Sequence, residues 1–342
     1  MRRSRITVDL GAIRRNAELL RGTAAPAEFW AVVKADAYGH GAVGAARAAL
    51  EGGASCLCVA TAREGEDLRE AFPAPRILVM SPLAPGEEAA ARDARLEVAL
   101  SSPEAPEGLD VHVKVDTGMG RWGMRLAEAL TVPRRQVVGV MSHLATADDP
   151  DESFAGEQIG RFQEVRAAFP GVTAHLANSA GALRFPEARF DAVRCGIALY
   201  GLSPFGDDPA GHGLEPALSW RSYVAHAREL RPGESTGYGR RFVAESPQRI
   251  GIVPVGYADG FRRGLSGTEV LVGGTRRRVV GTVSMDSLAV ELGDEPEGTE
   301  VTLIGDGILA EEHARVLGTI NYEITCGLNR DRTRSDRRII GG

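Results

Sequence analysis

Short apolar runs alternate with amphipathic helical patterns over the first two-thirds of the chain. After a first run at residues 6–10, eight runs of four or five residues have the length of buried strands, and helical spacing of apolar residues separates most of them. Eight strands alternating with helices in about 200 residues predict a closed (β/α)8 barrel, with an open doubly wound sheet as the alternative. The eight runs are 29–33, 56–60, 76–80, 96–100, 111–115, 137–141, 173–177 and 191–194.

The pattern changes from about residue 214 onward. Strand-like runs at 220–230, 249–255, 269–272, 278–285, 288–292 and 300–304 are separated by Gly or Pro turns, and one helical pattern at 309–317 interrupts them. This arrangement predicts a mostly antiparallel β domain. We therefore expect an α/β protein with a TIM-like barrel over residues 10–214, and a β domain built from residues 1–9 and 215–342.

Composition excludes several classes of protein. The chain has 342 residues, 43% of them hydrophobic and 25% charged, with a net charge of −6. No Lys/Arg block supports nucleic-acid binding, and no apolar run approaches the roughly 20 residues of a membrane helix. The first residues lack the apolar run of a signal peptide, so we expect a cytoplasmic location.

The cysteines indicate neither a disulfide framework nor a metal site. There are four, Cys56, Cys58, Cys195 and Cys326, in a long chain. In a strand, Cys56 and Cys58 would point to opposite faces, which is unsuitable for a shared metal ion. We expect no bound metal, and we interpret Cys195 as a packing residue.

Lysine is almost absent from this chain. Of 40 lysine and arginine residues, the lysines are Lys34 and Lys114. A surface charge tolerates either residue type, so biased codon usage is one explanation. The other is that these positions need an amine, since a desolvated lysine can become neutral and form a covalent bond whereas arginine stays protonated.

The positions of the two lysines favour the chemical explanation. Reactive residues in a (β/α)8 barrel lie at the C-terminal ends of strands, where Lys34 and Lys114 are both predicted to lie. The loops after strands seven and eight often bind phosphate in this fold, and here they carry Ser179 and Gly196. A lysine beside a phosphate site indicates a phosphate-bearing carbonyl cofactor held as a Schiff base, and pyridoxal 5′-phosphate fits.

An ordered series of motifs along the whole chain resembles the alanine racemases, which are pyridoxal-phosphate enzymes of fold type III. Each motif alone is weak, but together and in this order they are specific. The matching segments are 32–41 (VVKADAYGHG), 114–121 (KVDTGMGR), 142–147 (SHLATA), 177–180 (ANSA), 194–197 (RCGI), 237–239 (GYG), 255–260 (VGYADG), 283–286 (VSMD) and 320–323 (INYE).

The resemblance implies a role for each matching residue. Lys34 would hold the cofactor and act as the base on one face of the substrate carbon, and Tyr238, supplied by the partner subunit of a homodimer, would be the base on the other. Arg194 would hydrogen-bond the pyridine nitrogen. The phosphate would be held by five residues, and Asn178 would also bind the cofactor. The five are Tyr38, Ser179, Gly196, Ile197 and Tyr322.

The resemblance also implies which residues bind the substrate and which residues hold the site in place. Arg121 would bind the substrate carboxylate, and Lys114, as a carbamate, would position it. Tyr257 and Met285 would line the substrate entrance from the partner subunit. His143, with Asp286 as a further supporting residue, would set the environment of Tyr238.

Several residues have simpler readings. Taken alone, Tyr238 in its Gly-rich turn would more often be a surface tyrosine, and Arg194 would more often be a salt-bridge residue; the fit of Tyr238 to the ordered motifs reverses that balance. We assign structural or solvated positions to the remaining histidines, which are His40, His112, His175, His212, His226 and His313. Ser284 stands where many members of the family have cysteine, and the tail at 336–342 matches no pattern that we identify.

The function implied is interconversion of L- and D-alanine, supplying D-alanine for peptidoglycan. A broad-specificity or serine racemase on the same scaffold is the nearest alternative. A non-catalytic barrel that binds pyridoxal phosphate is a different class, and the predicted β domain and Tyr238 argue against it. A decarboxylase of the same architecture would use other residues in its second domain.

Overall fold

The computed structural model describes residues 3–342 and divides the chain into two compact units. One unit comprises residues 12–205 and 213–215, and the other comprises, of the described residues, 3–11, 206–212 and 216–342. Within the described residues, no helix is both long and apolar enough to cross a membrane.

The first unit is the barrel that the sequence predicts. Over the described part of the chain, eight parallel strands pair in the order of the sequence, and the last closes on the first where Glu28 pairs with Ala192 and Trp30 with Arg194. The strands are β2 (Glu28–Val32), β3 (Cys56–Val59), β4 (Arg76–Val79), β5 (Glu97–Leu100), β6 (Val111–Lys114), β7 (Val137–Met141), β8 (Thr173–His175) and β9 (Ala192–Cys195).

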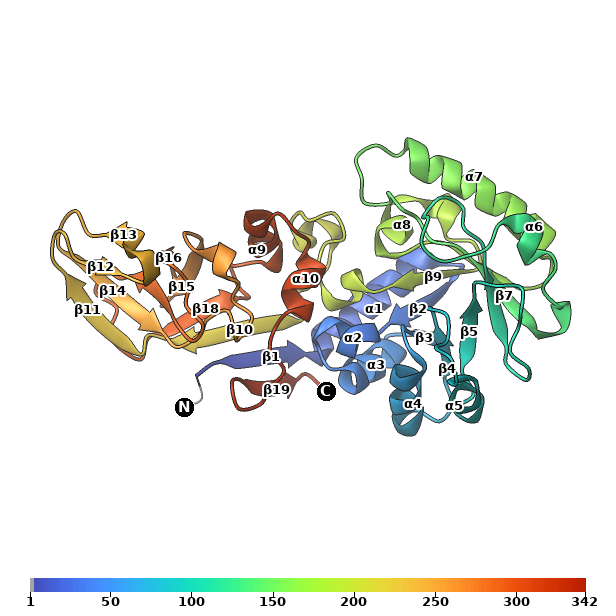
Figure 1. The fold of residues 1–342 in the computed structure, drawn as a ribbon, viewed down its shortest axis with the longest axis horizontal. Coiled ribbons are helices and arrows are strands. Elements are labelled where there is room, and N and C mark those ends of the chain that lie inside the picture. Colours follow the sequence, from blue (N-terminus) through green and yellow to red (C-terminus); the bar gives the residue numbers. More distant parts are fainter. Residues whose placement is uncertain (1–2) are drawn as a thin grey trace. The chain divides into compact units, whose positions relative to one another are not determined.

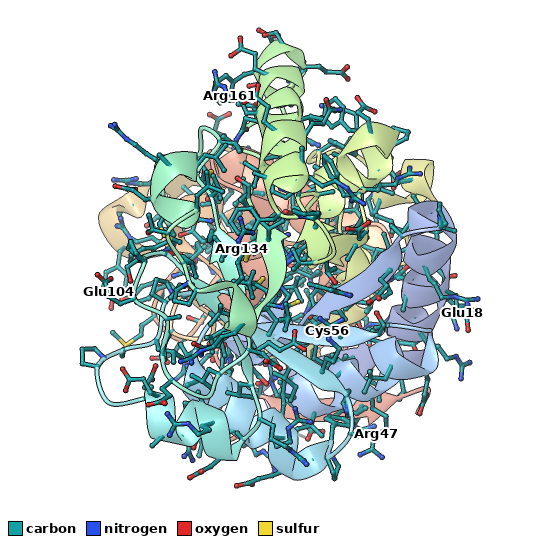
Figure 2. The ribbon with its side chains drawn as sticks, turned by 90° about the vertical axis from the view of Figure 1, so that its right-hand side faces the viewer. Glu18, Arg47, Cys56, Glu104, Arg134 and Arg161 are labelled. Carbon is teal, nitrogen blue, oxygen red and sulfur yellow. The ribbon has the colours of Figure 1, made fainter. Side chains whose placement is uncertain are left out.

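Helices cover the outside of this barrel (Figure 1). Figure 2 shows Cys56 among the strands, whereas the charged Glu18 and Arg47 project from the helical surface. Thr61 caps the helix that begins at Ala62. Its hydroxyl accepts a hydrogen bond from the N–H of Glu64, and the Glu64 carboxylate accepts one from the N–H of Thr61. The helices are α1 (Leu10–Ala24), α2 (Lys34–Tyr38), α3 (Ala42–Glu51), α4 (Ala62–Ala71), α5 (Glu88–Asp93), α6 (Leu126–Ala129), α7 (Ser153–Ala168) and α8 (Ser179–Arg184).

The second unit is built around a sheet of nine strands in the described chain, in the order β11-β14-β17-β16-β15-β18-β10-β1-β19, with a separate β12–β13 hairpin. Almost all of its pairs are antiparallel, which confirms the predicted class of this domain. The elements are β1 (Arg5–Asp9), β10 (Leu218–Tyr223), β11 (His226–Leu230), β12 (Ser235–Thr236), β13 (Phe242–Val243), β14 (Gln248–Val253), β15 (Glu269–Val272), β16 (Thr275–Val280), β17 (Leu288–Glu291), β18 (Glu300–Ile304), α9 (Ala310–Leu317), α10 (Asn321–Cys326) and β19 (Asp336–Ile340).

The structure corrects one expectation for this sheet and adds one strand to it. The run 220–230 is not one strand, because β10 pairs with β1 and β18 while β11 pairs with β14 on the far edge. The tail also forms a strand, β19, which lies parallel to β1 with Arg5 opposite Asp336. A strand of this kind has no strong apolar alternation of its own, because it lies at an edge and its end is exposed.

Candidate functional site

Lys34 lies two residues after the end of β2 and begins an unusual turn of backbone. The four residues after it, Ala35, Asp36, Ala37 and Tyr38, all have φ between 53° and 54°, so α2 is a left-handed turn of non-glycine residues. This conformation is unfavourable for L-residues and persists only where the surroundings impose it, as they often do at functional sites. Tyr38, 7% exposed, ends this turn, and its hydroxyl lies beside Gly196, which follows β9.

Neighbouring side chains hold this turn in place. Glu64 accepts the N–H of Ala35 at 2.7 Å, and Asp36 accepts the N–H of Ala42 at 2.8 Å. The ring of His40 donates through Nδ1 to the carbonyl of Ala37 at 2.9 Å. These bonds satisfy backbone groups that a left-handed turn would otherwise leave without partners.

A cradle of small groups lies between β8 and β9 and the residues that follow them. The Ser179 hydroxyl accepts the N–H groups of Gly196 at 3.0 Å and of Ala198 at 3.4 Å. A Cβ at Gly196 would overlap the Tyr38 hydroxyl, so only glycine fits here. The N–H groups of Ser179 and Ile197 meet no protein acceptor within residues 3–342. Backbone donors beside two hydroxyls suit a phosphate group.

Asn178 contributes to this cradle indirectly. Its side chain accepts the N–H of Gly181 at 2.9 Å and so caps α8. Asn178, predicted to bind the cofactor, therefore acts in this structure on the start of α8, next to Ser179.

Arg194 lies in the barrel interior, 3% exposed, with both terminal nitrogens engaged. One donates to His175 Nδ1 at 2.7 Å and to the His175 carbonyl at 2.8 Å. The other donates to the carbonyls of Ser142 at 2.7 Å and Leu176 at 3.1 Å and approaches His143 Nδ1 at 3.4 Å. Burial lowers the pKa of Arg194 to about 10, so it remains charged near neutral pH.

His175 is a residue that the sequence analysis left without a role. It contacts Arg194 directly and lies at the end of β8, two residues before the segment that carries Asn178 and Ser179. The sequence predicts His175 in the middle of the run 173–177, so no strand-end signal marks it.

Lys114 lies at the end of β6, 6% exposed, with its Nζ 3.4 Å from the carbonyl of Met80. Burial, and then the positive charges of Arg194, Arg121 and Lys34, lower the pKa of Lys114 to about 8. The two lysines and two arginines of the predicted site are thus close enough to repel one another. A group that carries negative charge would relieve this repulsion.

Arg121 lies on an ordered loop beyond β6. The Asp116 carboxylate accepts the N–H groups of Gly118 at 2.9 Å and Met119 at 2.8 Å, and Met124 returns to donate to the Lys114 carbonyl at 2.8 Å. The loop therefore presents an exposed Arg121 from a fixed base.

His143 approaches the terminal nitrogen of Arg194 that does not contact the His175 ring. Burial and the charge of Arg194 lower the pKa of His143 well below its usual value, so the ring is neutral. Gln158 of α7 holds the segment, because its amide accepts the N–H of Ala145 at 2.8 Å and donates to the His143 carbonyl at 3.0 Å.

The second unit carries the other predicted site residues on adjoining loops. Tyr238, 75% exposed, has its carbonyl bonded to the Thr282 hydroxyl at 3.0 Å. The N–H of Tyr257 donates to the Ser284 carbonyl at 3.0 Å, and a Cβ at Gly256 would overlap the backbone of Met285. Three large side chains, Tyr238, Tyr257 and Met285, are thus exposed around one segment, 282–286. Exposed apolar groups gathered in this way are typical of an interaction surface.

Asp286 and Tyr322 have structural surroundings in the same unit. Arg334 donates to the Asp286 carboxylate at 2.7 Å, which lowers the pKa of Asp286, and also pairs with the buried Asp259 at 2.7 Å. Tyr322 is half-buried on α10.

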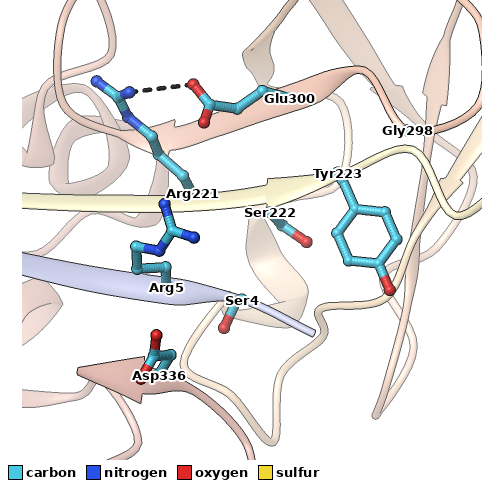
Figure 3. Close-up of a pocket in the computed structure, with 8 residues that line it drawn as sticks. All are labelled: Ser4, Arg5, Arg221, Ser222, Tyr223, Gly298, Glu300 and Asp336. Carbon is cyan, nitrogen blue, oxygen red and sulfur yellow. Dashed lines mark hydrogen bonds and ion pairs between the residues drawn. The ribbon is translucent and has the colours of Figure 1, made fainter. Parts of the chain in front are cut away.

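A hollow in the second unit contains none of the predicted site residues. Its lining side chains come from the sheet, and Figure 3 shows the ion pair between Arg221 and Glu300, which measures 3.0 Å, at its edge. Arg5 and Asp336 line it as opposed residues of β1 and β19. We interpret it as part of the polar surface of the sheet.

Sequence profiles of known families cover both units. The profile described as alanine racemase, N-terminal domain, matches residues 8–204, and that of alanine racemase, C-terminal domain, matches residues 217–336. The chain is 40% identical to alanine racemase 1 of Bacillus subtilis over 94% of its length and 90% of that protein. It is 42% identical to the alanine racemase of Mycolicibacterium smegmatis over 93% of its length and 90% of that protein.

Solved structures give the same result. The alanine racemase of Streptomyces lavendulae superposes with a TM-score of 0.93 at 35% identity, covering 100% of this chain and 98% of that one. The alanine racemase of Bartonella henselae, solved with covalently bound pyridoxal phosphate, has a TM-score of 0.91 at 29% identity, covering 98% and 99% of the two chains.

Proposed function

This chain belongs to the alanine racemase family, and we propose that its Lys34 and Tyr238 are the two bases of the reaction. It is a pyridoxal-phosphate enzyme that interconverts L- and D-alanine. Inverting a stereocentre requires a proton to leave one face of the α carbon and another to arrive at the opposite face, so two separate groups suit the task.

The donor set at the barrel mouth fits the cofactor, and the cradle that Gly196 keeps open is the observation that carries this assignment. Ser179, Gly196, Ile197 and Tyr38 would hold the phosphate, with Tyr322 as a further donor, while Lys34 would hold the cofactor covalently. When bound, pyridoxal phosphate withdraws electrons from the substrate α carbon and makes its proton removable.

Arg194 would face the ring nitrogen of the cofactor. A carboxylate there would keep that nitrogen protonated, whereas a guanidinium that is already engaged by His175 and backbone carbonyls does not give up a proton readily. The electron sink is then weaker, and we infer that this disfavours side reactions such as transamination.

Lys114 is suited to carbamate formation. With a pKa of about 8, about one amine in ten is unprotonated at pH 7, and a neutral amine adds CO₂ with loss of one proton. The product is an anion among cations, and it would pair with Arg121, which would bind the substrate carboxylate.

We expect the holoenzyme equilibrated with ¹³C-bicarbonate to show one carbamate signal by ¹³C NMR. The signal is expected to be absent from Lys114→Arg, because arginine does not offer a neutral amine, and present in Lys34→Ala. Since the chain has only these two lysines, the two variants serve as controls for each other. A wild-type spectrum without a carbamate signal would show that Lys114 works as a plain amine.

We propose further that the active enzyme is a cytoplasmic homodimer in which Tyr238, Tyr257 and Met285 act at the partner's barrel. The exposure of these three side chains around residues 282–286 supports this. The proposed role is supply of D-alanine for peptidoglycan.

We expect selectivity for alanine over larger amino acids. Purified enzyme is expected to racemise L-alanine at least about tenfold faster than L-serine or L-lysine by chiral separation, the range that one or two additional groups give in a pocket. Equal rates on all three would instead favour the broad-specificity alternative, and no racemisation of any would favour a cofactor-binding barrel without catalysis.

A further inference from the structure

A line of hydrogen-bonded side chains continues from Arg194 through the barrel interior. Arg194 on β9 contacts His175 on β8, whose Nε2 lies 2.7 Å from Nδ1 of His112 on β6. The Nε2 of His112 lies 2.9 Å from the carboxylate of Glu97, the first residue of β5. Glu97 is held from its other side by Arg76, the first residue of β4, at 2.7 and 2.9 Å. We refer to these five residues as the relay.

The two ends of the relay determine the direction of every bond in it. A guanidinium only donates, so His175 Nδ1 must accept and its hydrogen must lie on Nε2. His175 therefore donates to His112 Nδ1, and His112 donates from Nε2 to the Glu97 carboxylate, which only accepts. Reversing either ring would place two donors or two lone pairs against each other.

The charges of the relay are consistent with this direction. Burial lowers the pKa of His112 and lowers that of His175 further, so both rings are neutral. Burial alone would raise the pKa of Glu97, but the hydrogen bonds from His112 and Arg76 outweigh it and lower the pKa to about 2. Arg194 and Glu97 are thus opposite charges joined by two neutral rings.

The barrel makes space for these rings. A Cβ at Gly139 on β7 would overlap the ring of His112, so this position must be glycine. Trp30, fully buried on β2, packs against His175 with ring centroids 4.5 Å apart and against His112 at 5.8 Å. The Arg76 guanidinium covers the same indole at 4.9 Å. Both imidazoles are thereby fixed in position as well as in protonation.

We propose that Glu97 and His112 are positioning residues for the racemase, which act through His175 to fix the orientation of Arg194, the residue that would contact the ring nitrogen of the cofactor. The inference rests on the proposed contact of Arg194 with the ring nitrogen. It adds residues at the N-terminal end of the barrel that would support this contact. When the hydrogen of His175 is held on Nε2, its Nδ1 can only accept, so Arg194 must keep one N–H donor directed toward it. Without the carboxylate at the far end, both rings can reverse, and His175 would then present an N–H to the guanidinium.

The test is ¹⁵N NMR of histidine ring nitrogens in the holoenzyme, combined with kinetics. We expect His112 and His175 to be neutral in the wild type, each with its hydrogen on Nε2. In Glu97→Gln, the amide can donate as well as accept, so we expect mixed tautomers at both rings. We expect kcat to fall about tenfold, as is typical when a partner behind a functional group is lost, with KM for alanine within twofold.

Glu28→Gln is the matched control. Glu28 lies at the same end of the barrel, where its carboxylate accepts from the Trp30 indole at 2.7 Å and lies 3.6 Å from Arg76, but it does not contact His112. We expect wild-type tautomers and kcat within twofold. Arg76→Gln, at the half-exposed end of the relay, provides a milder variant if Glu97→Gln does not fold, and we expect a smaller change in the same direction.

The proposal is overturned if wild-type His112 or His175 is cationic or carries its hydrogen on Nδ1. It is also overturned if the tautomers change without a change in kcat, or if kcat falls while the tautomers stay fixed. The tautomers are independent of the roles given to Lys34 and Tyr238, so failure of those assignments would leave this test intact.

Discussion

Replacing Lys34 with alanine is expected to abolish racemisation in both directions, by more than about 10³-fold, as is found when a covalent nucleophile is removed. The variant loses the amine that would hold the cofactor and the base on one face of the substrate. Both losses affect L- and D-alanine alike, because each proton transfer route passes through the same two bases. Chiral analysis from either enantiomer measures the effect.

The scarcity of lysine makes this prediction unusually direct to check. Borohydride reduction of the holoenzyme, followed by peptide mass analysis, is expected to place the cofactor on Lys34. Lys114→Arg is the matched control, since it leaves Lys34 as the sole lysine and is expected to retain the label. Labelling of Lys114 in the wild type, or retained activity in Lys34→Ala, would contradict the assignment.

Tyr238→Phe is expected to lower the rate of racemisation about 10²- to 10⁴-fold, the range of a lost general acid–base group. We expect exchange of the α hydrogen in D₂O to persist for D-alanine, where Lys34 acts, and to be lost for L-alanine, where Tyr238 acts. Tyr223→Phe, on β10 of the same unit, removes a hydroxyl outside the predicted site and is expected to leave the rate unchanged. A Tyr238→Phe enzyme of nearly full rate would refute the two-base assignment.

Mixing the two inactive variants tests whether the site is shared. If Lys34 of one subunit works with Tyr238 of its partner, a hybrid dimer of Lys34→Ala and Tyr238→Phe has one intact site. Random exchange then restores about one quarter of wild-type activity, because half of the dimers are hybrids with one of two sites intact. No recovery after demonstrated subunit exchange would place both bases in the same chain.

The barrel, the class of the sheet and the family can all be predicted from the amino-acid sequence. The eight strand runs begin and end within about two residues of the observed strands, the spread expected at element ends. Runs such as 56–60 and 137–141 are buried throughout or nearly so, so their apolar character is continuous and easy to read. The scarcity of lysine alone indicates that Lys34 and Lys114 have a chemical role, without reference to any motif.

Other features depend on tertiary structure. The run 220–230 reads as one strand because both of its halves are equally strand-like. Only their pairing separates them, since β10 pairs with β1 and β18 whereas β11 pairs with β14. The left-handed turn after Lys34 also contradicts local preference, because Ala35 and Ala37 favour negative φ. Glu64, 29 residues away from Ala35, supplies one of the hydrogen bonds that hold it.

The buried histidines show most clearly where sequence reasoning ends. Nothing local distinguishes His112 and His175 from structural or solvated histidines, and the sequence alone predicts that both belong to that class. Barrel closure brings them between Arg194 and Glu97, and the hydrogen bonds at the two ends then settle the protonation of both rings. Apolar periodicity reports which residues are buried, whereas the state of a buried polar group depends on partners that only the folded chain brings within hydrogen-bonding distance.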